Sequence, residues 1–196
     1  TLAALADIAL GIVLIRLFAD RFEHRRLVFA VGAGAAVLLL TLVFGPLDPR
    51  SLASGVFRHG VAKLDEAVEV HFLRDGKTAT VAFVSNGSVG IISTNGKPDA
   101  SIDLRQGEVP TDDEITMAMA AALPLAMHPD PREIAIIGWG SGLTTHTLLG
   151  SQVPERVDSI EIERAMHEGA LNFGSRVARA YQDPRSQVHF DDARTY

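Results

Sequence analysis

Three glycines at alternate positions, Gly138, Gly140 and Gly142, follow a short apolar run in the sequence. The run, residues 134–137, predicts a central parallel strand buried on both faces, and a helix is predicted over 143–149. Glycine is needed where the backbone approaches a ligand closely, and the amides that start a helix favour a negative or electron-rich group. The segment therefore predicts a small-molecule site where the strand meets the helix.

The glycine spacing separates two classes of nucleotide ligand. A dinucleotide site wants a further glycine at the position of Leu143, whereas a ligand without a pyrophosphate fits the spacing found here. The loop thus favours S-adenosylmethionine or its decarboxylated form over NAD. Ser141 lies one place away from the nucleophile position of a serine hydrolase turn, so we assign it to the ligand loop and not to catalysis.

Acidic residues follow the next two predicted strands. Glu161 lies near the end of strand 157–162, and Asp191 and Asp192 follow strand 187–190. Glu161 comes about 20 residues after the loop, where a carboxylate can accept hydrogen bonds from both hydroxyls of a ribose. An acid at the following strand end could accept a hydrogen bond from an adenine amino group. Two structural alternatives stay open: Glu161 as an acid at a helix start, and the two aspartates as solvated turn residues.

The composition excludes several other kinds of site. Cysteine is absent, which rules out disulfides, thiolate metal sites and cysteine catalysis. The formal charge of −6 argues against nucleic acid as a partner, because phosphate binding needs a basic face. The histidines show no paired spacing suited to a metal ion.

The elements that position these residues predict an α/β fold. Thr111 is expected to cap a helix over 112–127, and a second long helix is expected over 164–180. Together with the predicted strands they make 111–196 the first half of a Rossmann-like, S-adenosylmethionine-dependent transferase domain, truncated at Tyr196. Ahead of it, a small antiparallel β domain is predicted over 51–110, from β-prone runs separated by turn pairs. The turn pairs are Asp75-Gly76, Asn86-Gly87 and Asn95-Gly96.

The segment 1–50 is strongly apolar and is predicted to hold transmembrane helices. Residues 27–47 carry no charge, and a helix of about 20 residues can cross a hydrocarbon core. The stretch 2–18 is also apolar but contains Asp7 and Arg16, and it is interpreted as the end of another spanning helix. We therefore expect an integral membrane protein that contacts the lipid bilayer, with the side of the catalytic domain undetermined. A pair of buried helices in a soluble domain is the alternative.

From Asp75 onward the sequence resembles the spermidine synthases, which are polyamine aminopropyltransferases. The resemblance rests on four blocks in a specific order: NGKPDAS, LPLAMHPDPREIAIIGWGSG, SIEIE and DPRSQVHFDDARTY. With the apolar segment in front, the sequence is most similar to the membrane-fused spermidine synthase-like proteins. The resemblance implies aminopropyl transfer from decarboxylated S-adenosylmethionine to a diamine, as in polyamine biosynthesis. It also implies that Gly138, Gly140 and Gly142 line the nucleoside site, that Glu161 holds the ribose and that Asp192 holds the adenine.

The sequence departs from the family pattern at several positions. Ser141 stands where an Asp often follows the second glycine, and Ala193 replaces a usual glycine. On the substrate side, Asp99 stands in place of a usual Gln, and Thr116-Met117-Ala118 replace a Tyr-His-Glu or Tyr-Gln-Glu group. The resemblance puts the catalytic Asp on a loop after the next strand, beyond Tyr196. These departures predict that nucleoside binding is kept while the specificity for the amine is altered.

Three functions remain open from the sequence. The first is a spermidine synthase-like aminopropyltransferase with decarboxylated S-adenosylmethionine as co-substrate, an amine acceptor and no prosthetic group. The second is a methyltransferase-like protein that uses intact S-adenosylmethionine. The third is a non-catalytic, nucleoside-sensing domain of a membrane transporter. The resemblance also allows a homodimer.

Overall fold

The computed structural model describes residues 7, 10–15, 17, 24–44, 48–105 and 107–196. The chain divides into two compact units, Thr1–Leu47 and Asp48–Tyr196.

The first unit contains the helix α2, which runs for 21 residues from His24 to Phe44. Its first turn includes Arg25 and Arg26, so the uncharged part of the described helix runs from Leu27 to Phe44. Among the helices of the described residues, none is long and apolar enough to cross a membrane. The predicted integral membrane location is therefore wrong, and no described helix supports the predicted transmembrane segments or bilayer contact.

Other parts of that prediction fall on residues outside those described. Residues 45–47, at the end of the uncharged segment, are among them, and so is much of the stretch 2–18 that was expected to form another spanning helix.

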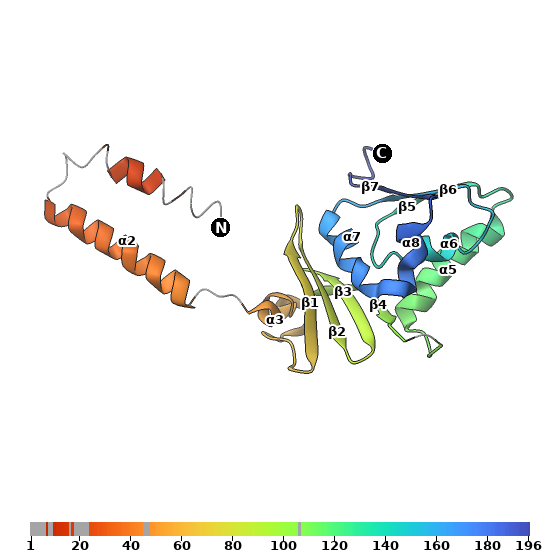
Figure 1. Ribbon diagram of the computed structural model, residues 1–196, viewed down its shortest axis with the longest axis horizontal. Coiled ribbons are helices and arrows are strands. Elements are labelled where there is room, and N and C mark those ends of the chain that lie inside the picture. Colours follow the sequence, from red (N-terminus) through yellow and green to blue (C-terminus); the bar gives the residue numbers. More distant parts are fainter. Residues whose placement is uncertain (1–6, 8–9, 16, 18–23, 45–47, 106) are drawn as a thin grey trace. The chain divides into compact units, whose positions relative to one another are not determined.

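The second unit begins with the short helices α3 (Pro49–Leu52) and α4 (Val56–His59), followed by an antiparallel sheet. Asn95 and Gly96 have φ angles of 48° and 73°, the positive values that a two-residue hairpin turn requires. The predicted antiparallel meander is confirmed. Its strands lie in chain order: β1 (Val68–Asp75), β2 (Thr80–Asn86), β3 (Val89–Thr94) and β4 (Lys97–Asp103) (Figure 1).

After this sheet the chain builds a parallel sheet with the order β5-β6-β7. Its strands are β5 (Glu133–Ile137), β6 (Arg156–Ile160) and β7 (Ser186–His189). The helix α5 (Asp112–Met127) precedes β5, and α6 (Leu143–Leu148) connects β5 to β6. Thr111 caps α5 as predicted, because its hydroxyl accepts a hydrogen bond from the amide of Glu114. The α/β fold class is confirmed.

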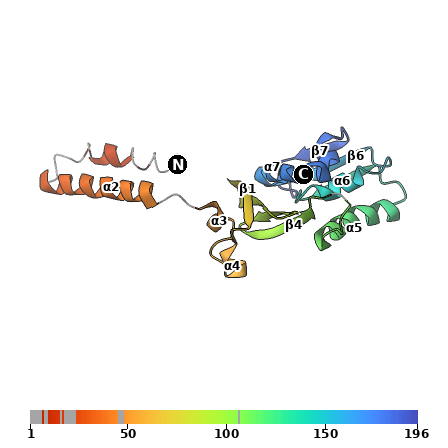
Figure 2. The same cartoon turned by 60° about the horizontal axis from the view of Figure 1, so that its bottom comes forward.

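The helices α5, α6 and α8 cover one face of the parallel sheet (Figures 1 and 2). On the other face the side chain of Ala135 is exposed, and that of Ile137 is exposed to 81%. The strand β5 forms one edge of the described sheet, and its residues alternate between the covered and the open face. The prediction that this strand is buried on both faces is therefore wrong for the structure described.

The single helix predicted over 164–180 is broken into three pieces in the structure. These are α7 (Arg164–Ala170), the 3₁₀ helix η2 (Leu171–Val177) and α8 (Ala178–Gln182). Gly174 has φ 59° and ψ −128°, a backbone conformation that side chains strongly disfavour. The break lets Phe173 pack edge-on against Phe83 of the antiparallel sheet, with ring centroids 4.8 Å apart.

The two sheets share one hydrophobic core, so they are not packed as independent modules. The antiparallel sheet and the parallel half contribute buried side chains to the same cluster, which includes Val81, Phe83, Ile92, Ile102, Trp139, Leu143, Met166, Phe173 and Val177. This packing places α7 against the antiparallel sheet, beside the β1–β2 hairpin.

Candidate nucleoside-binding site

The loop that follows β5 has the backbone conformation that its glycines predict. Gly138, Gly140 and Gly142 have φ angles of 90°, 55° and 81°, all in the region that only glycine adopts readily. A Cβ atom added to Gly138 or Gly140 would meet no atom within 4 Å, whereas one added to Gly142 would lie 3.0 Å from the Trp139 ring. The first two glycines therefore present bare backbone to open space, and the third allows the loop to close on its own tryptophan.

Glu161 is held against this loop from the end of β6. The residue is only 7% exposed, and its carboxylate accepts hydrogen bonds from the amides of Trp139, at 2.7 Å, and Glu163, at 2.8 Å. An ionised carboxylate offers about four acceptor positions, so these two amides leave capacity for further donors. Glu161 is thus fixed in place before any ligand is present.

A cleft of about 190 Å³ brings together four of the predicted site residues. They are Gly138, Glu161, Asp191 and Asp192, and they come from the ends of all the parallel strands. The rest of the lining is apolar: Ile137, Ile160, Ile162 and Ala193. We call this space the Glu161 cleft. A carboxylate at its base and apolar walls around it suit a flat heterocycle joined to a sugar.

The two aspartates after β7 are less firmly held than Glu161. Asp191 is exposed, and its carboxylate accepts a hydrogen bond from the amide of Asp192 at 2.7 Å. The side chain of Arg194 pairs with both carboxylate oxygens of Asp192. These hydrogen bonds, together with one from the Arg194 amide and the charge of Lys77, lower the pKa of Asp192. A ligand would have to compete with Arg194, which is itself 88% exposed.

Ser141, by contrast, points away from the cleft. Its side chain is fully buried, and its hydroxyl accepts a hydrogen bond from the Leu143 amide at 3.2 Å at the start of α6. The same hydroxyl donates to the sulfur of Met117 in α5 at 3.0 Å. Gly140 and Gly142 also lie outside the lining of the Glu161 cleft, as the structure describes it.

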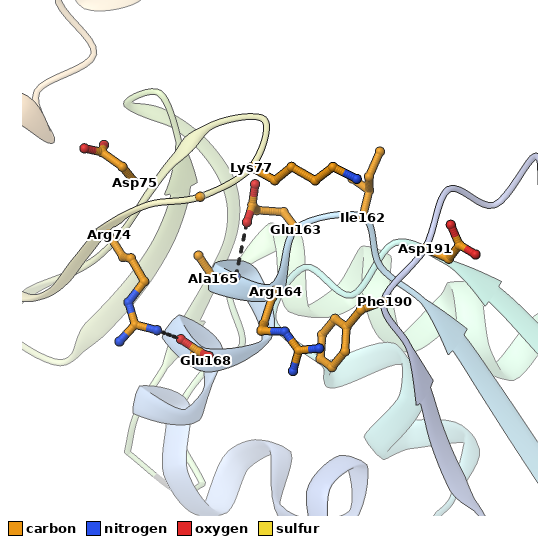
Figure 3. A pocket seen from close by; sticks show the side chains of 11 residues that line it. Arg74, Asp75, Lys77, Ile162, Glu163, Arg164, Ala165, Glu168, Phe190 and Asp191 are labelled. Atoms are coloured by element: carbon orange, nitrogen blue, oxygen red, sulfur yellow. Dashed lines mark hydrogen bonds and ion pairs between the residues drawn. The ribbon is translucent and has the colours of Figure 1, made fainter. Parts of the chain in front are cut away.

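A second, larger cleft of about 400 Å³ adjoins the first and shares Ile162 and Asp191 with it. It lies between the β1–β2 hairpin and the start of α7, and Figure 3 shows the side chains that line it. They are Arg74, Asp75, Lys77, Ile162, Glu163, Arg164, Ala165, Glu168, Phe190 and Asp191, with Gly76. We call it the hairpin cleft. Arg74 pairs with Glu168, and the Arg164 guanidinium lies 4.0 Å from the centre of the Phe190 ring.

An aromatic cluster behind the glycine loop was not foreseen from the sequence. The indole of Trp139 donates to the Tyr181 hydroxyl at 3.1 Å, and that hydroxyl donates to the backbone oxygen of His167 at 2.7 Å. Burial raises the pKa of Tyr181 and so keeps it a neutral donor. The one tryptophan of the chain lies between two of the loop glycines, and that position was the available signal. These contacts hold Trp139 in place within the glycine loop.

Comparison with known proteins finds relatives of the C-terminal part of the chain. Residues 114–196 match the family model of the spermine/spermidine synthase domain. Over these residues the chain is similar to the spermine/spermidine synthase domain. The family resemblance drawn from the sequence is therefore confirmed.

The curated relatives agree over a similar length of chain. A polyamine aminopropyltransferase from Nitrosomonas europaea is 36% identical over 75 residues, which is 38% of this chain and 23% of that protein. Spermidine synthase 1 from Hyoscyamus niger is 34% identical over 74 residues, covering 38% and 24%. The matches thus span about a quarter of the length of these synthases.

A solved structure shows the same fold. The spermidine synthase from Thermotoga maritima aligns with a TM-score of 0.53 at 19% identity, covering 63% of this chain and 41% of that one. A spermidine synthase solved in complex with the transition-state analogue AdoDATO aligns with a TM-score of 0.52, also at 19% identity.

Of the positions at which this chain departs from the family pattern, Ala193 lines the Glu161 cleft, whereas Asp99 and the triplet 116–118 are not among its lining residues. Asp99 occupies a register irregularity in β4, and its carboxylate accepts from the Thr94 hydroxyl and lies 3.6 Å from Lys97. In α5, the Thr116 hydroxyl donates to the backbone oxygen of Asp112, and Met117 contacts Ser141. The polar side chains at these positions are thus engaged within their own elements or with the glycine loop.

Proposed function

We propose that residues 111–196 form the nucleoside-binding part of an aminopropyltransferase that uses decarboxylated S-adenosylmethionine and an amine acceptor. The observation that carries the proposal is the Glu161 cleft, which gathers a bare glycine backbone and three carboxylates at the ends of parallel strands. Ligands bind at this edge in open α/β sheets. The family match over 114–196 supports the reaction class.

In this proposal the residues of the cleft bind and orient the nucleoside. Glu161 accepts hydrogen bonds from the ribose hydroxyls, since its two bonded amides leave acceptor capacity. Asp192 accepts from the adenine amino group after releasing Arg194, and Asp191 lies beside it. Gly138 lets the backbone approach the sugar closely. Gly140, Ser141 and Gly142 keep the loop in its conformation without lining the cleft.

The reaction is a displacement at carbon. The lone pair of the acceptor amine attacks the methylene carbon next to the sulfonium, the carbon–sulfur bond breaks, and the sulfur leaves as a neutral thioether. The amine then loses a proton to a base. Alignment of amine and sulfonium supplies most of the acceleration, and a carboxylate suits the role of base. The family resemblance assigns that base to an Asp beyond Tyr196.

A binding comparison tests this function. We expect decarboxylated S-adenosylmethionine to bind the chain more tightly than intact S-adenosylmethionine in calorimetric titrations. Tighter binding of the intact form would favour the methyltransferase-like function instead. Binding of neither form would contradict the nucleoside site altogether.

The amine acceptor of this proposal is not a simple diamine. Asp99 already bonds Thr94 and lies near Lys97, and the triplet 116–118 lacks the aromatic and acidic groups of the family pattern. A dication leaves water only where charged or polar partners replace its hydration. We therefore expect poor turnover of putrescine by the complete protein in a steady-state assay. Efficient spermidine formation would show that these substitutions do not matter.

A further inference from the structure

The turn of the β1–β2 hairpin rests directly on the carboxylate of Glu163. The Thr78 amide donates to Glu163 Oε2 at 2.8 Å, and the Thr78 hydroxyl donates to the same oxygen at 3.2 Å. A Cβ atom added to Gly76 would lie 2.1 Å from Glu163 Oε1. The turn can therefore approach the carboxylate this closely only because residue 76 is glycine.

Glu163 also connects that turn to the Glu161 cleft. Its Oε1 accepts from the Ala165 amide at 3.3 Å and so caps α7, while its own amide donates to Glu161 at 2.8 Å. Glu161 in turn accepts from the Trp139 amide in the glycine loop. A continuous chain of hydrogen bonds thus runs from the glycine loop through Glu161 and Glu163 to the hairpin.

The burial and charge of Glu163 indicate that these bonds matter. The residue is only 4% exposed. Burial alone would raise its pKa, but the hydrogen bonds from Thr78, Ala165 and the Lys77 amide outweigh burial and lower it. The group is therefore an ionised carboxylate whose charge is held by donors from the hairpin and from α7. Since it faces the hairpin and not the Glu161 cleft, it is not itself placed to bind the nucleoside.

The hairpin turn carries Lys77 to the place where the two clefts meet. In Figure 3 the Lys77 side chain extends from the turn over the hairpin cleft toward Ile162, which lines both clefts. The Lys77 charge also reaches Asp192, since it contributes to lowering the pKa of that residue. The position of the turn therefore decides how much positive charge faces the outer end of the Glu161 cleft.

We propose that Glu163 is a positioning residue that couples occupancy of the Glu161 cleft to the β1–β2 turn and thereby sets the position of Lys77. This proposal rests on the proposed function, because it takes the ligand of the cleft to be a nucleoside. A ligand that bonds Glu161 restrains the backbone of Glu163 through their shared hydrogen bond. The restrained Glu163 then holds Thr78 more firmly, so the hairpin closes over the occupied site.

Hydrogen exchange of the Thr78 amide, with decarboxylated S-adenosylmethionine as the probe, tests this coupling. We expect the ligand to slow exchange at Thr78 in the unmodified chain at least about threefold. In Glu163→Gln that slowing should be lost, because one amide oxygen cannot replace two carboxylate oxygens and the NH₂ group opposes a donor. Nucleoside affinity should fall only severalfold. Glu155→Gln, the same change in a surface pair with Arg132, should behave like the unmodified chain.

The outcomes separate the two proposals. Failure of the probe to bind the unmodified chain would overturn the proposed function and this inference with it. Binding without any change at Thr78, or equal slowing in Glu163→Gln, would overturn the coupling and leave the proposed function standing.

A second pair of variants tests the contact itself and does not depend on the ligand. Gly76→Ala should lower the thermal unfolding midpoint, because the new methyl group would overlap the Glu163 carboxylate. In a Glu163→Ala background the same change should cost clearly less, since the overlapping atoms are gone. Equal losses in both backgrounds would show that the turn does not rest on Glu163.

Discussion

The ends of β6 and β7 both carry acidic residues, but the two strand ends hold them in different ways. After β6, Glu161 and Glu163 are buried, and backbone amides occupy their carboxylates. After β7, Asp191 is exposed, and Asp192 is only partly buried and pairs with Arg194, whose side chain is largely exposed. One end is built into the fold, and the other is open to solvent.

This difference indicates how the two ends would respond to a ligand. Amides that belong to a loop and a helix start keep Glu161 in one orientation, so a ribose would meet an acceptor that is already aligned. Asp192 must exchange Arg194 for the adenine amino group when the nucleoside binds. The net contribution to the binding free energy is then only the difference between these two similar interactions. We therefore expect the β6 end to supply most of the affinity and the β7 end to adjust it.

The largest expected effect on nucleoside affinity comes from removing the carboxylate of Glu161. Glu161→Ala deletes the acceptor for the ribose and frees the amides of Trp139 and Glu163. A lost hydrogen bond to a charged group is worth roughly 1.5–3 kcal/mol, so nucleoside affinity should fall about 10- to 100-fold. Calorimetric titration of folded Glu161→Ala with decarboxylated S-adenosylmethionine measures this. Unchanged affinity would contradict the assignment of Glu161 to the ribose, and with it the larger contribution expected from the β6 end.

The pH dependence of the unfolding free energy should also show the charge of Glu163 at the β6 end. The folded pKa of Glu163 lies below its usual value of 4.5, so its stabilising contribution is fully present above that pH. The contribution is lost as the pH falls through the folded pKa. Between pH 5 and pH 3 the urea unfolding midpoint should therefore fall more steeply in the unmodified chain than in Glu163→Gln. The reason is that only the unmodified chain takes up a proton at residue 163 when it unfolds in this range. Parallel curves would mean that the hairpin contact does not depend on the charge.

A smaller effect is expected at the β7 end. Asp192→Asn keeps an oxygen that can accept from the adenine amino group, but it removes the charge that Arg194 and Lys77 now face. We expect nucleoside affinity to fall by no more than about threefold to tenfold, well short of the loss in Glu161→Ala. The same titration decides it. A loss equal to that of Glu161→Ala would show that the two strand ends contribute alike.

The parts of the molecule that could be predicted from the sequence depend on local chemistry. Asn95-Gly96 supplies its own positive φ angles, and Thr111 with Glu114 caps α5 through side chains three residues apart. The positions of Gly138 and Glu161 around one cleft follow from the alternation of strands and helices, since parallel strands end at the same edge.

The parts that could not be predicted depend on contacts between distant segments. Thr78 and Glu163 are 85 positions apart, and only the shared core of the two sheets brings them together. The break at Gly174 serves the packing of Phe173 on the antiparallel sheet, which the helical pattern around it does not reveal. The membrane prediction rested on hydropathy alone, and none of the described helices is long and apolar enough to cross a membrane.

The smallest predicted effect has the opposite sign to the others. Arg194→Ala removes the side chain that occupies both oxygens of Asp192, so the carboxylate becomes free to accept from the adenine. Because Arg194 is 88% exposed, its pairing with Asp192 is screened by water, and its removal should hardly change the unfolding midpoint. Nucleoside affinity should rise, by about twofold to threefold, since the ligand no longer displaces a partner.

Calorimetric titration at low and high salt checks the reason as well as the result. High salt weakens exposed ion pairs, so the advantage of Arg194→Ala over the unmodified chain should shrink as salt is added. A variant that binds more weakly than the unmodified chain would mean that Arg194 contacts the ligand itself, and the β7 end would then be as much a built site as the β6 end.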